Sequence, residues 1–412
     1  MKKSILVLLL ILSLCLLPAC NRGSAESSEK PARYGDYGAV MAINLARTAP
    51  QREPGSQGEQ TALNFLEQSL AELGYQGERQ PFSYTDAQGR SKQSANLIVK
   101  IPGRGFSLES DYEPGTEAIE ELRPPSVIDG RRLYILAHYD SYPGLDPALE
   151  LEGRSNLGSL NQADGIHDNA AAVAVLLTLA KEAKNTSPGY DLYLVFTGAS
   201  HDNSAGARAL LSSLDDNAKS LTDCVINLST IYAGDKVYAH AGRNSVLGQN
   251  QKSYRLRRKL YELTDIYYNY LLLTNNDFAI YTNQSLVDVT HPELGVVTQY
   301  REWTLQNGDH TPFDQAGLPV IFIQSGQYDF NAEETAFKES TDPLFQPSGG
   351  RIKGTPYDSS SLLLKHFTAQ AQENESDPDS EQAIDRLNRN INNLAFVLLE
   401  LSFKGPPHCE MN

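Results

Sequence analysis

The chain has 412 residues, a length that fits one large α/β domain or two domains of ordinary size. Hydrophobic residues are 40% of the chain and charged residues 21%, which is the composition of a globular protein with a sizeable core. The formal net charge of -16 argues against a general nucleic-acid-binding protein, because such a protein needs a basic face to displace counterions. No nucleic acid is therefore expected among its partners.

Residues 1–20 carry the features of an export signal. Lys2 and Lys3 form a short positive region, and an almost entirely aliphatic run follows. That run is shorter than the ~20 residues that a membrane-spanning helix needs. Ala19 before Cys20 resembles a bacterial lipoprotein cleavage site, so Cys20 is expected to be lipidated as the first mature residue; a plain secretory signal peptide is the alternative. We therefore expect the protein in the cell envelope, outside the cytoplasm, with a lipid anchor in a bacterial membrane.

The remaining chain is expected to form a flexible tether at residues 21–33, which are polar, and one domain at 34–412. A helix is predicted at 57–75, where apolar residues recur at helical spacing. Later in the chain, short apolar runs typical of buried strands are separated by helical stretches. In chain order, strands are expected at 80–84, 94–101, 133–137, 191–197, 223–228 and 318–323, and helices at 170–183, 205–214, 252–272 and 383–403.

This alternation of strand and helix predicts a mostly parallel sheet with helices on both faces. Residues 233–307 are harder to interpret, since they contain one predicted helix and much irregular sequence, and we assign them to the same domain. The acidic, proline-containing stretch 372–380 predicts an exposed loop.

Polar residues gather at the ends of the predicted strands. Ligands of open α/β sheets bind outside the carboxyl ends of the strands. One His alone is more often structural, but several His and Asp residues at successive strand ends favour a metal site, because both are ordinary zinc ligands. Two zinc ions bridged by a carboxylate can activate water and hold a substrate carbonyl, with a nearby Glu as general base. The residues in question are His138, Asp140, Asp168, Ser200, His201, Asp202, Ser229, Asp309 and His310.

Three segments resemble metallopeptidase family 28: AHYDS at 137–141, GIHDNAAAVAVLL at 165–177 and GDHTPFDQAGLPVIFI at 308–323. That family includes bacterial zinc aminopeptidases, and glutaminyl cyclases are similar to it. The likeness extends over nearly the whole chain from residue 34 and is weakest at 233–307. It implies an α/β fold of the zinc-exopeptidase (phosphorylase/hydrolase-like) type, with a mostly parallel mixed sheet flanked by helices on both faces. It also implies a peptide, or a peptide amino terminus, as the partner.

The resemblance implies roles for individual residues. His138 matches a metal ligand, and Asp140 matches the Asp that orients this ligand. Asp168 matches the carboxylate that bridges two metals, and His310 matches a late His ligand. The alternative is a decayed scaffold that keeps these residues for packing.

The chain departs from the family where a Glu-Glu pair usually supplies the general base and then a metal ligand. Ser200 and His201 stand at these two positions. His201 can still bind zinc, but the Ser200 hydroxyl cannot act as a carboxylate base near neutral pH. Asp202 would supply a carboxylate if the loop were shifted by one residue.

A second departure concerns the number of metals. Ser229 stands where a ligand is usually Asp, and a neutral Ser is a poor zinc ligand. One metal site would keep Asp168, His201 and His310, whereas the other would keep only His138 and the shared Asp168. The ligand set therefore favours one zinc ion over two.

The resemblance implies a metal-dependent aminopeptidase that hydrolyses peptides at a one-zinc or weakened two-zinc site. A catalytically inactive peptide-binding lipoprotein on the same scaffold is one alternative, because loss of a general base usually costs ~10²–10⁴-fold in rate. A glutaminyl cyclase-like acyltransferase with one zinc is the other.

Overall fold

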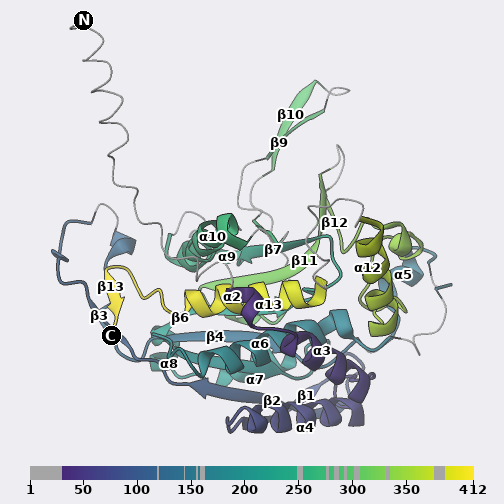
Figure 1. The fold of residues 1–412 in the computed structure, drawn as a ribbon, viewed down its shortest axis with the longest axis horizontal. Helices are drawn as coiled ribbons and strands as arrows, with labels where there is room; N and C mark the ends of the chain where they lie inside the picture. The colour runs from purple at the N-terminus through teal and green to yellow at the C-terminus, as the bar shows by residue number, and fades with distance from the viewer. Residues whose placement is uncertain are drawn as a thin grey trace, which may run out of the picture.

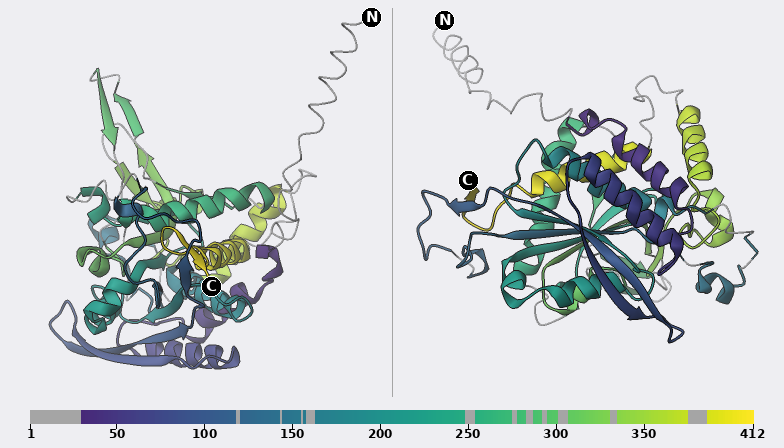
Figure 2. Two further views of the ribbon diagram at one scale, coloured as in Figure 1. Left: turned by 90° about the vertical axis from the view of Figure 1, so that its left-hand side faces the viewer. Right: turned by 90° about the horizontal axis from the view of Figure 1, so that it is seen from below.

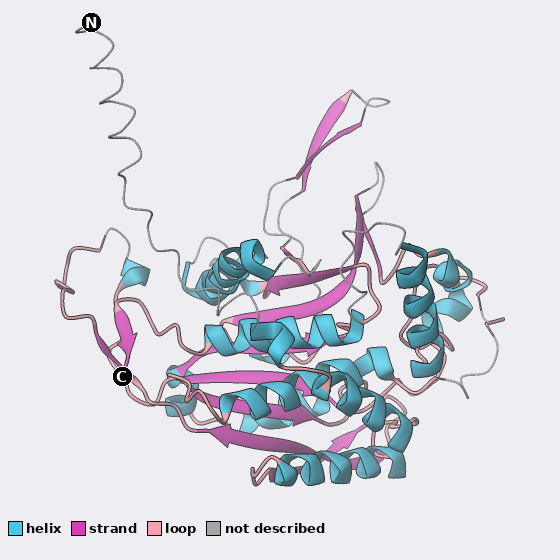
Figure 3. Cartoon of the chain, viewed as in Figure 1, coloured by secondary structure: helices cyan, strands magenta, loops and turns pink. Residues whose placement is uncertain are grey.

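One large sheet runs through the middle of the molecule, and helices cover both of its faces (Figures 1 and 3). Its nine strands in the described part of the chain follow the order β1-β2-β5-β4-β6-β11-β7-β8, and β12 pairs with β11. The strands are β1 (Glu78–Thr85), β2 (Ser91–Ile101), β4 (Arg132–His138), β5 (Asp191–Thr197), β6 (Thr222–Ser229), β7 (Lys236–Ala241), β8 (Ile280–Tyr281), β11 (Val320–Phe330) and β12 (Thr335–Lys338).

The computed structural model describes residues 30–117, 120–142, 144–154, 156–157, 163–247, 254–274, 278–282, 287–291, 295–300, 307–330, 335–374 and 386–412. The expected signal peptide, Cys20 and most of the expected tether lie outside these residues. The described helices include none that is both long and apolar enough to cross a membrane.

The centre of the sheet is parallel, and both of its sides include antiparallel pairs. β4 pairs in parallel with β5 and β6, and β6 pairs in parallel with β11. β2 runs antiparallel to β5, and β7 runs antiparallel to β11. The predicted fold class, a mostly parallel mixed sheet between two layers of helices, is confirmed.

The two faces of the sheet have separate cores because successive strand residues point to opposite sides. Leu133 and Ile135 of β4 belong to the larger apolar cluster, which includes α6 (Ala171–Ala183). Tyr134, between them, belongs to a smaller cluster that includes residues of α7 (Ala205–Ser213). Burial on both faces explains why the central strands are continuous apolar runs rather than alternating ones.

Other helices extend these two layers. α3 (Tyr37–Thr48) and α13 (Arg386–Leu401) pack against α6, and α4 (Gln57–Glu72) packs against β2. A hairpin of β9 (Val287–His291) and β10 (Val296–Tyr300) projects from the body (Figure 2). The remaining elements are α2 (Lys30–Arg33), β3 (Phe106–Leu108), η1 (Glu120–Leu122), α5 (Pro147–Leu151), η3 (Ile166–Ala170), α8 (Asp216–Leu221), α9 (Asn244–Leu247), α10 (Tyr254–Thr274), α11 (Thr311–Gln315), η4 (Pro343–Ser348), α12 (Ser360–Asn374) and β13 (Cys409–Met411).

Each strand and helix predicted from the sequence is present, with ends that differ by a few residues. The largest difference in length concerns the strand predicted at 318–323, which continues to Phe330. Parts of two regions that were expected to be irregular, the tether at 21–33 and the loop at 372–380, are helical. Residues 30–33 of the expected tether form α2, which packs against α13. Residues 372–374 of the expected exposed loop belong to α12, and the rest of that loop lies outside the described residues.

Candidate metal centre

The candidate site lies where the loops after two neighbouring parallel strands meet. His138 is the last residue of β4 and pairs in register with Thr197, the last residue of β5. Asp140 follows two residues after β4, and His201 follows four residues after β5. Because parallel strands end at the same edge of a sheet, their loops bring these side chains together.

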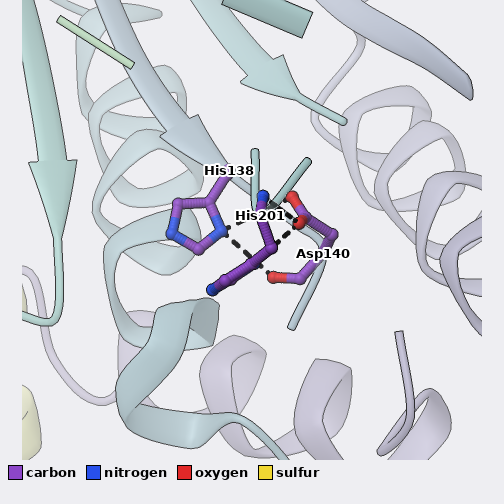
Figure 4. A group of neighbouring side chains, drawn as sticks. All are labelled: His138, Asp140 and His201. Atoms are coloured by element: carbon purple, nitrogen blue, oxygen red, sulfur yellow. Dashed lines mark hydrogen bonds and ion pairs between the residues drawn. The ribbon is translucent and has the colours of Figure 1, made fainter. Parts of the chain in front are cut away.

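Asp140 contacts both imidazoles on one side of the site (Figure 4). Its Oδ2 lies 2.8 Å from Nδ1 of His201. Nδ1 of His138 lies 3.1 Å from the backbone carbonyl oxygen of Asp140 and 3.5 Å from its Oδ1. A carbonyl oxygen only accepts, so Nδ1 of His138 carries a proton and donates it.

Asp168 faces the opposite nitrogen of each ring. Nε2 of His201 lies 2.8 Å from Oδ2 of Asp168, and Nε2 of His138 lies 3.3 Å from Oδ1. The two rings meet edge to face, with centroids 5.0 Å apart. Oδ1 of Asp168 is buried and has no hydrogen-bond partner among the described residues. Each imidazole therefore lies between the same two carboxylates.

The charges of this cluster are interdependent. Burial by itself lowers the pKa of His201, but the carboxylates of Asp168 and Asp140 outweigh it and raise that pKa to about 9. The pKa of His138 is raised in the same way, against burial, by its contacts with Asp140 and Asp168. The two imidazoles in turn hold the pKa of Asp168 well below its usual range despite its burial. Without a metal, the cluster is thus a network of buried ion pairs.

The donor set fits a zinc ion. Nδ1 protons that point to a carboxylate or carbonyl leave Nε2 as the ligand atom, which is the usual arrangement around zinc-binding His residues. Two imidazole nitrogens and a carboxylate are ordinary zinc ligands, and ligand atoms on one tetrahedral zinc lie roughly 3.3 Å apart. The His138–Asp168 distance of 3.3 Å agrees with this spacing, whereas the His201–Asp168 distance of 2.8 Å is that of a direct hydrogen bond and would lengthen around an ion. Within the described residues, His138, Asp140 and His201 also form a group whose potential ligand atoms all lie within 4.8 Å of one another.

His310 and Ser229 come from other elements, since His310 directly precedes α11 and Ser229 ends β6. The His310 ring is buried and stacks on Phe322 of β11, with ring centroids 4.4 Å apart. His310 is not a member of the close group of potential ligands, and its role as a ligand stays a prediction. Ser229 ends β6, where it pairs in register with Gln324.

The two candidates for the general base are both engaged in other contacts. The Ser200 hydroxyl donates to Oδ1 of Asp309 (2.8 Å), a carboxylate that is 1% exposed. Asp202 pairs instead with Lys92 of β2, at 3.4 Å between Oδ2 and Nζ. The hydroxyl at the usual base position is therefore bound to the carboxylate of Asp309, a residue that precedes a predicted strand and to which we assigned no role.

Buried polar residues hold the site loops in place. Arg52 is fully buried and donates to the backbone carbonyl oxygens of Tyr139, Asp164 and Gly165 at 2.8–2.9 Å. Asp358 accepts the amides of both His167 and Asp168, in the turn that carries the shared carboxylate. Burial raises the pKa of Asp358 to about 7 despite these two amides. No residue spacing in the sequence indicated either role, because both roles depend on contacts between distant segments.

A pocket opens beside the cluster and borders on Tyr142. The ring of Tyr142 meets the ring of His201 edge to face, with centroids 4.9 Å apart. Other residues that line the pocket are Gln51, Glu53, Ser141, Gly165, Gly354, Thr355 and Asp358. The pocket therefore lies next to the imidazole that would hold a metal.

A parallel-centred sheet with His and Asp side chains at its carboxyl edge is the architecture of the zinc-exopeptidase class. The sequence profile of peptidase family M28 matches residues 119–353. The alkaline phosphatase isozyme conversion protein of Escherichia coli K12 is 26% identical over 323 residues, which are 78% of this chain and 80% of that protein. Since the profile covers more than half of the chain, the chain belongs to peptidase family M28, and the resemblance found in the sequence is confirmed.

Solved structures support the same fold. A zinc aminopeptidase from Bacillus subtilis superposes with a TM-score of 0.53 and 12% identity, over 89% of this chain and 94% of that chain. A glutaminyl cyclase from Bacteroides thetaiotaomicron superposes with a TM-score of 0.51 and 13% identity, over 88% of this chain and 96% of that chain. At these sequence identities, the structural likeness shows the fold alone. Membership of peptidase family M28 indicates a metal ion, typically zinc.

Proposed function

We propose that this chain is a zinc-dependent aminopeptidase that acts on peptides and holds one zinc ion with His138, His201 and Asp168. The observation that carries the proposal is the pair of imidazoles, each with Nδ1 toward Asp140 and Nε2 toward Asp168. A bound zinc ion would polarise a peptide carbonyl and lower the pKa of a bound water.

The residues of the chain supply positioning around that ion. Asp140 orients both imidazoles, and Tyr142 contacts the His201 ring and lines the adjacent pocket. We assign this pocket to the amino-terminal part of the peptide. The Ser200 hydroxyl, backed by the Asp309 carboxylate, stands at the position of the usual base and would hold a water or a substrate amide by hydrogen bonds.

A second candidate function is peptide binding without turnover. It is favoured by one observation: the residue at the base position is Ser200, and its hydroxyl already donates to Asp309, so a hydroxyl and not a carboxylate stands in place of the usual Glu. In that case the same pocket and the same cluster would bind a peptide amino terminus, and hydrolysis would be negligible.

The deciding experiment starts from the purified mature protein. Its metal content is measured by mass spectrometry, and rates are then measured on a panel of aminoacyl chromogenic substrates with and without chelator. One equivalent of zinc and chelator-sensitive release support the aminopeptidase. Zinc with cyclisation of amino-terminal Gln peptides, but no release, would indicate a cyclase instead. Peptide binding by calorimetry without any turnover would support the binding protein, and failure to bind zinc at all would refute the metal centre.

We further propose that Cys20 anchors the protein by a lipid outside the cytoplasm. The supporting features are the positive Lys2-Lys3 start, the aliphatic run and Ala19 before the cysteine. Mass spectrometry of the mature protein should find a diacylated residue 20 at the amino terminus, and Cys20→Ser should prevent this modification. Cleavage elsewhere without lipid would establish a plain secretory signal instead.

A further inference from the structure

Glu59 lies in the first turn of α4 but reaches out of that helix to the loop after β5. The Ser56 hydroxyl accepts the Glu59 amide at 3.1 Å, and this Ser-x-x-Glu spacing is that of a capping box. In a capping box the Glu carboxylate binds the amide of the capping residue. Here Oε2 accepts the Gly55 amide (2.7 Å), while Oε1 accepts the Ala199 amide (2.8 Å) and the Ser94 hydroxyl (2.9 Å).

The loop after β5 presents three consecutive amides to two carboxylates. The Ala199 amide donates to Glu59, whereas the amides of Ser200 and His201 donate to Oδ1 and Oδ2 of Asp140, each at 3.0 Å. Ala199 has a φ of 49°, in the left-handed region that a residue with a Cβ adopts at an energetic cost. Successive amides of such a turn form a nest that binds anions. Two protein carboxylates occupy this one.

The ends of the same loop are fixed by β2. Oδ1 of Asn96 accepts the Gly198 amide (3.2 Å), and its Nδ2 donates to the Gly206 carbonyl oxygen (2.9 Å). A Cβ on Gly198 would lie 2.3 Å from the Ser94 hydroxyl oxygen, so the loop lies directly on this strand. Asn96 therefore joins the two ends of the loop, at Gly198 and Gly206. Glu59 binds the loop at Ala199, next to Ser200 and His201.

We propose that Glu59 is a positioning residue of the metal centre, which fixes the backbone at Ala199 so that the following imidazole, that of His201, is held between Asp140 and Asp168. This inference rests on the proposed function, because the orientation of His201 matters most if its ring binds the metal. Glu59 is 3% exposed. Removal of the Glu59 carboxylate leaves the buried Ala199 amide without an acceptor. The backbone at Ala199 is already in an unfavourable left-handed conformation, so we expect this turn to relax and the His201 ring to move with it.

The test compares Glu59→Ala and Glu59→Gln with Glu67→Gln, a control on the same helix whose carboxylate pairs with Arg79 near the surface. Zinc affinity is measured by competition with a chromophoric chelator, and amide hydrogen exchange is measured over residues 198–203 in the metal-free protein. We expect Glu59→Ala to lower zinc affinity roughly 10-fold to 100-fold, as the loss of partners behind metal ligands does. Exchange in the loop should rise as well.

Glu59→Gln keeps one acceptor oxygen for Ala199 and Ser94 but turns its amide group toward the Gly55 amide. It should therefore retain loop protection better than Glu59→Ala, and Glu67→Gln should match the wild type. Unchanged exchange and affinity in both Glu59 variants would overturn the inference. If the wild type itself binds no zinc, the proposed function fails, while the exchange measurement still decides whether Glu59 holds the loop.

Discussion

Asp140 binds His201 at two points, because its Oδ2 accepts both the backbone amide (3.0 Å) and the ring Nδ1 (2.8 Å) of that residue. One carboxylate thus fixes where the loop runs and keeps a proton on Nδ1, so that Nε2 is the nitrogen available to a metal. The same carboxylate lies 3.5 Å from Nδ1 of His138. Since Asp140 is fully buried, these contacts are not shared with bulk water and orient both rings strongly.

Asp140→Asn should weaken the metal centre while keeping the size of the side chain. An Asn has one acceptor oxygen, so its NH₂ group must face either the Ser200 amide or the two donors of His201. We expect zinc affinity to fall roughly 10-fold to 100-fold, and the free energy of unfolding to fall by about 1–3 kcal/mol. Zinc competition and urea denaturation measure the two effects. Asp216→Asn, at an exposed position on α8, is the control, and equal values in both variants would contradict the assigned role.

The metal-free protein should lose stability as the pH rises through the His201 pKa. That pKa is raised from 6.5 to about 9 in the folded protein, so its stabilisation is complete below pH 6.5 and is lost by about pH 9. The effect is at most on the order of 3 kcal/mol, because the two imidazoles share the same carboxylates. The measurement is urea denaturation of wild type and His201→Gln from pH 6 to 10, in chelator. A difference between them that does not change with pH would refute the paired imidazolium.

Zinc affinity should have the opposite pH dependence over the same window. Zinc binds the unprotonated Nε2, so it must displace the proton that the carboxylates stabilise, and binding should tighten as the pH rises. Calorimetry in buffers of different ionisation enthalpy measures the number of protons released. Release of no proton at pH 7 would mean that the imidazoles are neutral in the metal-free protein.

Restoring a carboxylate at position 200 should require a second change. Ser200→Glu alone places a carboxylate against the buried Asp309, and two carboxylates in contact cannot both ionise freely. We expect Ser200→Glu with Asp309→Asn to raise aminopeptidase turnover by up to ~10²–10⁴-fold, which is the usual contribution of a general base. Ser200→Glu alone should raise turnover less. Its pH optimum should lie higher, because the neighbouring Asp309 carboxylate raises the pKa of the new Glu. Rates against pH for these variants and for the exposed control Ser212→Glu test this, and equal rates in the single and double variants would argue against the coupling.

Arg52→Met should destabilise the fold strongly, because it removes the hydrogen-bond donors of a fully buried guanidinium. The Arg52 guanidinium is fully buried and satisfies the carbonyl oxygens of Ala49, Tyr139, Asp164 and Gly165. The Gly165 carbonyl oxygen would keep the Ala170 amide, but those of Ala49, Tyr139 and Asp164 would lose the Arg52 donor. A buried carbonyl group left without a donor costs about 1–3 kcal/mol before relaxation, so we expect a loss of at least about 3 kcal/mol. Guanidinium denaturation measures the loss. The exposed Arg47→Met serves as the control, and a loss below about 1 kcal/mol would contradict this account.

The positions of His138 and His201 at the sheet edge could be predicted from the sequence because each residue follows a recognisable strand, and Asp168 could be placed there because it precedes an apolar helix. The apolar runs of β4 and β5 are buried on both faces, so their ends and their parallel pairing could be predicted. The contact of Glu59 with the site loop could not be predicted from the sequence, because no local pattern indicates it. Its spacing from Ser56 fits a helix cap, and only the approach of α4 to β2 and the following loop turns its carboxylate toward Ala199.

The sequence by itself determined the layered α/β architecture and the polar edge of the sheet, since both follow from local apolar periodicity and from the order of strands and helices along the chain. The tertiary structure alone decided which polar residues meet. In the folded chain, His138 and His201 both contact Asp168. Asp202 pairs with Lys92, and His310 stacks on Phe322. The physical reason is that hydrogen bonds and ion pairs act over a few ångströms, so side chains on different loops interact according to the positions that packing gives those loops.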